Sequence, residues 1–306
     1  MNNLYYSFGD YLKEKFGERV HRISLDAGFS CPNLDGHKST QGCHYCNNKA
    51  FGVHAQSQKN IPHQIEESIG YYRRKLNVHK FIAYFQSFSN TYADCEKLKE
   101  TYDVIKGYSE IVGLFISTRP DCVDREKLKL IADYQRDYLV WIEYGLQTTH
   151  DRILGAIGRN HSYEDFLLTL ANTRAYGISV GVHMILGLPG QSEEDMLVDA
   201  RRLGALDIQG IKFHALHVLR GTAFEELYAV GNMHLLQREE YIRIVCDYLE
   251  YLPAKVVILR LVSTARAHYL VAPAWVNDKS LVTEGIRREL ERRGTRQGFR
   301  TARRSP

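Results

Sequence analysis

Six short apolar runs rich in β-branched residues recur along the first two thirds of the chain, and amphipathic stretches separate them. The runs cover residues 21–28, 80–86, 111–118, 139–147, 178–187 and 210–219. The stretches near 62–78, 94–107, 124–137, 162–176 and 191–205 have the periodicity of amphipathic helices. Strands that alternate with helices form parallel sheets, and strands buried on both faces have nearly continuous apolar sequences. The pattern therefore predicts an α/β fold in which six βα units curl into an open, partial (β/α)6 barrel of the TIM type.

After residue 220 the pattern changes. It predicts helices near 223–229 and 235–251, a strand over 255–262 and a closing helix near 278–293. We therefore expect a partial barrel over 1–220 and a C-terminal α/β extension with a basic tail over 221–306. No internal repeat or low-complexity linker separates the two parts, which indicates that they form one structural unit.

The composition is that of an ordinary globular protein, with 306 residues, 44% hydrophobic and 25% charged. No apolar run is long enough to span a bilayer, and the N-terminus lacks the apolar stretch of a secretory signal. We expect a cytoplasmic protein without a membrane partner, in a compartment where thiols stay reduced.

The net charge of +4 is mild but unevenly placed, because residues 287–304 hold eight arginines against Glu289 and Glu291. Arginine pairs readily with phosphate. The segment predicts either a contact with nucleic acid or the solvated face of a last helix followed by a terminal tail.

Three of the six cysteines lie near the start of the chain. Cys31, Cys43 and Cys46 stand as C-x11-C-x2-C, with Tyr45 directly before the last, and the other three are scattered singly. Thiolates select zinc or iron-sulfur clusters over hard cations. A cluster normally takes four cysteines, so three of them suggest a metal centre with one position open.

Two other interpretations of these cysteines stay open on spacing alone. A structural zinc ion needs a fourth ligand. The nearby candidates are His37, His44 and His54. The C-x2-C pair could also be a chance spacing of buried cysteines.

The residues around the cysteines resemble the radical S-adenosylmethionine (SAM) superfamily, and more narrowly its YhcC/YtqA group. The resemblance rests on DAGFSCPNLDG at 26–36 and GCHYCNN at 42–48. It implies that Cys31, Cys43 and Cys46 hold a [4Fe-4S] cluster whose fourth iron is chelated by SAM, and that Tyr45 lies beside the adenine. It also implies reductive cleavage of SAM to a 5'-deoxyadenosyl radical, which abstracts hydrogen from a substrate.

The same resemblance assigns further residues to the cofactor, and these fall at the carboxyl ends of predicted strands, where α/β barrels place their active sites. It implies that Gln86, Ser87 and Asn90 lie near the methionyl amino group, although such residues also serve ordinary turns. Other residues implied to contact SAM are Glu143 and Gln147 at the ribose end, Arg159 at a carboxylate, and Gly187, Leu188 and Pro189 at the adenine. A carboxylate such as Glu143 in a strongly apolar run is costly to bury without a partner.

Three residues are candidates for the substrate. Arg119 in STRPDC would face the cavity, although an arginine before a proline turn can also lie at the surface. His161 in GRNHS is either a general base or a hydrogen-bonded structural histidine, and we assign it no chemical step. Lys279 ends a segment, 260–279, that resembles the C-terminal signature of the group but lacks an acidic residue near Thr264.

The motifs GCHYC, TRPD, E-x-G-x-Q, R-x-H and GLPG also resemble the catalytic subunit of Elongator, without its acetyltransferase domain. With the arginine tail, this favours transfer RNA (tRNA) as the substrate, modified at the C5 substituent of the wobble uridine. An electron donor such as flavodoxin or ferredoxin would reduce the cluster. The alternatives are a small-molecule reaction like that of oxygen-independent coproporphyrinogen oxidase, and a zinc-stabilised nucleic-acid-binding module without catalysis.

Overall fold

A single curled sheet of seven parallel strands forms the centre of the protein. A computed structural model describes residues 3–51 and 59–301. The strands follow one another in the order β1 (Val20–Leu25), β2 (Lys80–Phe85), β3 (Ile111–Thr118), β4 (Leu139–Gln147), β5 (Ser179–Leu186), β6 (Gly210–Ala215) and β8 (Val257–Arg260). Every neighbouring pair in this sheet is parallel. The predicted fold class, an open partial barrel of βα units, is confirmed.

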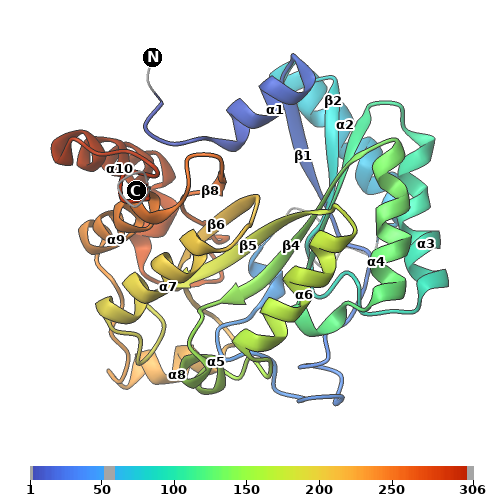
Figure 1. Ribbon diagram of the computed structural model, residues 1–306. Helices are drawn as coiled ribbons and strands as arrows, with labels where there is room; N and C mark the ends of the chain where they lie inside the picture. The colour runs from blue at the N-terminus through green and yellow to red at the C-terminus, as the bar shows by residue number, and fades with distance from the viewer. Residues whose placement is uncertain (1–2, 52–58, 302–306) are drawn as a thin grey trace.

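The helices that link these strands cover the outer face of the sheet (Figure 1). They are α2 (Ile61–Leu76), α3 (Cys95–Asp103), α4 (Arg125–Asp133), α5 (Asp151–Ala156), α6 (Tyr163–Ala175) and α7 (Glu193–Ala205). Local sequence sets where they begin, since Ser162 and Ser192 each form a capping box with an aspartate three residues later. The five predicted stretches agree with the bounds of α2, α3, α4, α6 and α7, except that α3 and α4 each end in a short 3-10 turn. The six-residue α5 was not predicted.

One predicted strand is wrong in its extent. The run 210–219 is broken after Ala215, and Val218–Leu219 form a separate strand, β7, which pairs antiparallel with β9 (Leu270–Ala272). A strand of two or three residues is too short to have a periodicity of its own, so the apolar sequence alone joined β7 to β6.

The C-terminal part consists of α8 (Ala223–Ala229), α9 (Arg238–Tyr251), β8 and α10 (Lys279–Arg293). The strand predicted over 255–262 is β8, and it pairs with β6 as the seventh strand of the central sheet. Helix α9 packs against α7, and α10 packs against α9. The division of the chain at residue 220 stays a prediction.

Helix α1 (Phe8–Phe16), which the sequence analysis did not predict, fills the amino-terminal end of the barrel. Leu12 is buried in a cluster with Ile82, Phe115 and Trp141. The ring of Tyr11 meets that of Trp141 edge to face, with 5.5 Å between their centroids. The chain before α1 also pairs with the sheet, because Ile258 donates its N–H to the carbonyl of Tyr6 at 2.8 Å. With this end occupied by apolar side chains, the polar groups inside the barrel lie toward its carboxyl end.

The arginines of α10 are engaged in ion pairs. Arg287 pairs with Glu284 and Arg292 with Glu289 along the helix, and Arg293 reaches Asp247 on α9 at 2.7 Å. The pair of Arg293 with Asp247 joins α10 to α9, and the pairs along α10 follow the expectation of a charged helix face. A contact with nucleic acid stays a prediction. No helix of the described residues is long and apolar enough to cross a membrane.

Candidate active site

The three clustered cysteines lie in the loop after β1 and line one cavity of about 140 Å³ at the carboxyl end of the sheet. Cys31 and Cys43 are buried and Cys46 is exposed. Nitrogen donors point at two of the sulfurs. The Nδ2 of Asn33 donates to Cys43 Sγ at 3.3 Å, the Nη1 of Arg159 donates to the same sulfur at 3.6 Å, and the Nδ2 of Asn48 donates to Cys46 Sγ at 3.6 Å. Hydrogen bonds to cysteine sulfur are a common feature around iron-sulfur clusters, where they tune the reduction potential.

Two arginines make this cavity suitable for an anionic group. Burial opposes ionisation of the Cys43 thiol, but the charge and hydrogen bond of Arg159, with the charge of Arg119, bring its pKa below its ordinary value. Arg119 is only 2% exposed and is held by Asp121 through two hydrogen bonds of 2.9 and 2.8 Å. Its Nη1 has no hydrogen-bond partner among the described residues. A buried N–H donor left without an acceptor is costly, and a cluster carried by three thiolates would supply negative charge beside it. The residues present therefore fit a [4Fe-4S] cluster.

A single metal ion fits this cavity less well. Within residues 3–51 and 59–301, no three Cys, His, Asp or Glu side chains converge closely enough to hold one ion. His37 and His44 complete no such set, and His54 lies outside the described residues. A cluster requires no such convergence, because each of its cysteines binds a different iron atom. The geometry thus favours the cluster over a closed zinc site.

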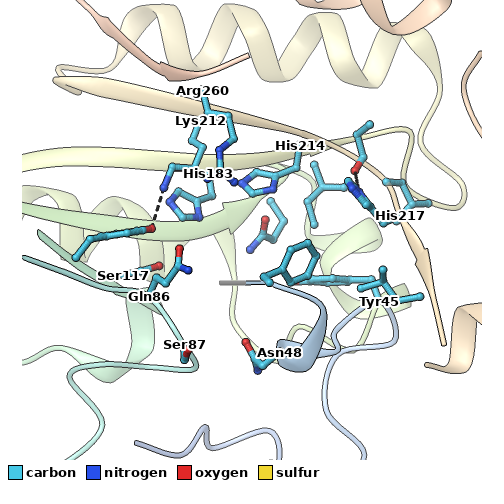
Figure 2. Close-up of a pocket in the computed structure, with 17 residues that line it drawn as sticks. Tyr45, Asn48, Gln86, Ser87, Ser117, His183, Lys212, His214, His217 and Arg260 are labelled. Carbon is cyan, nitrogen blue, oxygen red and sulfur yellow. Dashed lines mark hydrogen bonds between the residues drawn. The ribbon is translucent and has the colours of Figure 1, made fainter. Parts of the chain in front are cut away.

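A second cavity, of about 160 Å³, opens next to the first. The two share five residues of wall: Tyr45, Asn48, Ser117, Gln147 and His183. Figure 2 shows the second cavity, with Gln86, Ser87 and Ser117 on one side and Lys212, His183 and Arg260 on the other. Because the wall is shared, a ligand in the second cavity would lie against whatever the cysteines hold.

Several residues that the resemblance assigned to SAM line these cavities. Tyr45 and Gln147 line both, Gln86 and Ser87 line the second, and Arg159 lines the first. Gln147 lies at an irregularity in the pairing of β4 with β5 and has a φ of +77°, a backbone conformation that is strained for a residue other than glycine. Strain of this kind is typical of functional sites.

Other assigned residues lie behind the cavity walls. Asn90 is fully buried, and its Nδ2 donates to the carbonyls of Ser87 and Ser117 at 3.0 and 2.9 Å, so it fixes the loop after β2 to the end of β3. The Gly187–Pro189 turn is held by Gln191, whose Oε1 accepts from the N–H groups of Gly187 and Leu188 at 3.1 Å. Leu188 is buried in one cluster with Ile185 and Leu216, which do line the second cavity.

Glu143 lies at the centre of a buried polar network below the second cavity. Its carboxylate forms an ion pair with Lys212 and accepts hydrogen bonds from His183 at 2.6 Å, from the hydroxyl of Tyr84 at 2.8 Å and from Arg22 at 3.2 Å. Burial opposes its ionisation, but Lys212, His183 and Arg22 hold its pKa well below the usual range. The protein thus supplies partners for this carboxylate, and its predicted contact with a ribose stays a prediction.

The three substrate candidates differ in position. Arg119 lines the cysteine cavity. His161 is buried and accepts a hydrogen bond from Arg159 Nε at 3.0 Å, while burial and the charge of Arg159 lower its pKa to about 3, so it is neutral and helps to position Arg159. Lys279 is the exposed first residue of α10 and lines neither cavity.

Sequence reasoning missed several residues of the second cavity. These are Tyr84, His183, Lys212, His214 and Arg260. A signal for some of them was present, since Lys212 and His214 alternate along β6 and therefore share one face of the sheet. The cost of burying a charge, which singled out Glu143, applies equally to Lys212.

Comparisons with known proteins agree with this geometry. The model of the radical SAM superfamily matches residues 36–203, more than half of the chain, and that of the radical SAM C-terminal domain matches 208–292. The chain belongs to the radical SAM superfamily. It is 34% identical to YtqA of Bacillus subtilis over 295 residues, which covers 96% of this chain and 92% of YtqA. It is 33% identical to YhcC of Escherichia coli K12 over 273 residues, covering 89% and 87%. The predicted YhcC/YtqA group is confirmed.

Solved structures show the same fold. The archaeal Elp3 of Methanocaldococcus infernus, with a deleted N-terminus, superposes with a TM-score of 0.65 at 19% identity, over 91% of this chain and 64% of that one. Methylornithine synthase superposes with a TM-score of 0.54 at 14% identity, over 93% and 85%. Members of the superfamily use a [4Fe-4S] cluster and SAM, so the predicted cofactors are confirmed at the level of the family.

Proposed function

We propose that this radical SAM protein is an enzyme that modifies tRNA at the wobble uridine, by acting on the C5 substituent of that base. The observation that carries an enzymatic role is the wall shared by the two cavities, because it would bring a substrate into contact with the cofactor. The bound cluster and SAM supply one-electron chemistry that removes a hydrogen atom from the substrate. An electron donor such as flavodoxin or ferredoxin would reduce the cluster.

The chain's own residues would position the reactants and exclude water. The thiolates of Cys31, Cys43 and Cys46 would hold the cluster, with the guanidinium groups of Arg119 and Arg159 balancing its negative charge. Helix α1 keeps solvent out of the amino-terminal end of the barrel. Such a dry, enclosed site protects reactive species from side reactions.

A tRNA substrate is supported by sequence similarity over the radical SAM core. The chain is 27% identical over 185 residues to the tRNA uridine(34) acetyltransferase of Dehalococcoides mccartyi, which covers 60% of this chain and 39% of that protein. We propose the same class of substrate for this chain, and not the whole activity of that longer protein.

The direct test compares the modified nucleosides of tRNA from cells with and without the gene. We expect the change to fall at the wobble uridine and to be reversed by the wild-type gene but not by a Cys43→Ala gene. An unchanged wobble nucleoside would refute the tRNA proposal and leave a small-molecule reaction, such as a decarboxylation, as the alternative.

The enzymatic role itself is tested on the purified protein. After anaerobic reconstitution with iron and sulfide and addition of a reductant, we expect a brown protein that releases 5'-deoxyadenosine from SAM. Alanine at Cys31, Cys43 or Cys46 should abolish the release. Cys95, which begins α3 and lines neither cavity, offers a matched control, and Cys95→Ala should keep it. A colourless zinc protein that leaves SAM intact would refute the enzyme and support the nucleic-acid-binding module.

A further inference from the structure

The deep end of the second cavity carries more positive than negative charge. Lys212 on β6 and Arg260 on β8 line the cavity, and the charge of Arg22 on β1 acts on both. Among the described residues, Glu143 is the carboxylate that Lys212 and Arg22 share. Lys212 and Arg22 pair with Glu143 directly. The neighbouring His183 adds no charge at neutral pH, because burial and the charge of Lys212 lower its pKa to about 4.

Arg260 is the cation near this network that has no direct contact with Glu143. Its guanidinium group makes no hydrogen bond or ion pair with any residue in the described part of the chain, and Figure 2 shows it entering the cavity beside Lys212 and His183. Burial and the charge of Arg22 lower its pKa by more than Tyr84 and Glu143 raise it, yet a guanidinium stays protonated under all ordinary conditions. Arg260 is partly buried, and its side chain lines the cavity, so its charge is partly removed from water without a direct anionic partner. Such a charge, facing a cavity, is suited to an anionic group that enters with a ligand.

The position and shape of the site favour a carboxylate. A guanidinium group presents a planar pair of donors that matches the two oxygens of a carboxylate. The cavity is small, about 160 Å³, and α1 fills the amino-terminal end of the barrel. A phosphate of the tRNA backbone would remain outside such a cavity, whereas the end of a side chain on a base could enter it. Arg260 also lines only the second cavity, away from the cysteines.

We propose that Arg260, with Lys212 beside it, binds a carboxylate group of the substrate at the closed end of the second cavity. This proposal rests on the proposed function in one respect, namely that a substrate occupies this cavity. It does not depend on the substrate being tRNA.

The first experiment needs neither cofactor nor substrate. Thermal unfolding of the apo chain is measured in acetate, in inorganic phosphate and in chloride at equal ionic strength. An anion that binds only the folded chain raises Tm. We expect acetate to raise the Tm of the wild type above its value in chloride, and Arg260→Gln to lose this rise completely. Arg288→Gln is the control, because Arg288 is exposed on α10, and it should respond to acetate like the wild type.

The same data contain a second readout that a purely structural arginine would not give. In chloride, Arg260→Gln should be at least as stable as the wild type, since the substitution removes a partly buried charge that has no direct partner. A loss of stability in chloride, or an equal response to acetate in both proteins, would overturn the proposal. A rise in Tm with phosphate but not with acetate would overturn the choice of a carboxylate.

The second experiment separates the substrate from SAM, which has a carboxylate of its own. In the reconstituted protein, the Kd for SAM should change less than twofold in Arg260→Gln. A Kd for SAM that is tenfold higher in Arg260→Gln would assign Arg260 to the cofactor and overturn the proposal. Neither measurement uses tRNA, so an unchanged wobble nucleoside would refute the proposed substrate without bearing on the carboxylate site.

Discussion

At the scale of single residues, Glu143 and Lys212 show how charged side chains can be buried at the centre of the barrel, because each charge balances the other. Both side chains are at most 1% exposed, and they are 69 positions apart in the chain. A buried ion pair contributes little net stability by itself, but removal of one partner leaves the other charge uncompensated. If either Glu143 or Lys212 is present, the fold therefore needs the other residue to balance its charge.

We predict that Glu143→Gln destabilises the apo protein by about 3–5 kcal/mol, because it leaves the charge of Lys212 buried without a partner. The double variant Glu143→Gln, Lys212→Met should be less destabilised than the sum of the two single variants. Urea unfolding of all four proteins measures this coupling. Strict additivity of the two single effects would show that the ion pair is not the source of the loss.

The same pair shows what the sequence could not tell. The apolar run around Glu143 indicated that the carboxylate needs a partner, and Lys212 was visible in another apolar run. Nothing in one sequence states which distant residues face each other across a barrel, since strand periodicity fixes the face of a side chain but not its opposite neighbour. Arg260 escaped notice for the same reason.

At the scale of elements, the strands and helices of the parallel sheet were predictable because each is long enough to have its own periodicity. The failures were the short pieces β7, β9 and α5, together with α1, whose burial depends on a barrel end that only the complete fold creates. Helix α1 is nevertheless important for the barrel, because Leu12 packs among core residues of β2, β3 and β4.

We predict that Leu12→Ala lowers the free energy of unfolding by about 2–5 kcal/mol, the usual cost of a cavity in a closely packed core. Leu168 on α6 is 64% exposed, and Leu168→Ala should change stability by less than about 0.5 kcal/mol. Chemical unfolding of Leu12→Ala and Leu168→Ala measures this difference in stability. Equal stabilities would mean that α1 is not an integral part of the core.

At the scale of the whole molecule, buried histidines connect the stability of the fold to pH. Burial lowers the pKa of His183 and of His217, in each case to about 4. In the unfolded chain a histidine titrates near 6.5. Between these values the unfolded chain binds protons that the folded chain does not, so stability must fall as the pH falls.

We predict that the apo protein loses stability between pH 7 and pH 5, by up to about 2 kcal/mol for each of these two histidines. The urea midpoint at the two pH values measures the loss. His217→Gln should show a smaller difference between the midpoints than the wild type. If the variant and the wild type respond to pH equally, His217 does not take part in this linkage.

Because α1 closes the amino-terminal end of the barrel, it limits the routes by which ligands can enter and leave. Among the described residues, aromatic and aliphatic side chains pack into the amino-terminal end, whereas both cavities lie at the carboxyl end. Substrate and products would therefore enter and leave at the carboxyl end. Because the two cavities share a wall, a ligand that binds farther from the opening would have to enter first and leave last. This arrangement would impose an obligatory order of substrate binding and product release on each turnover.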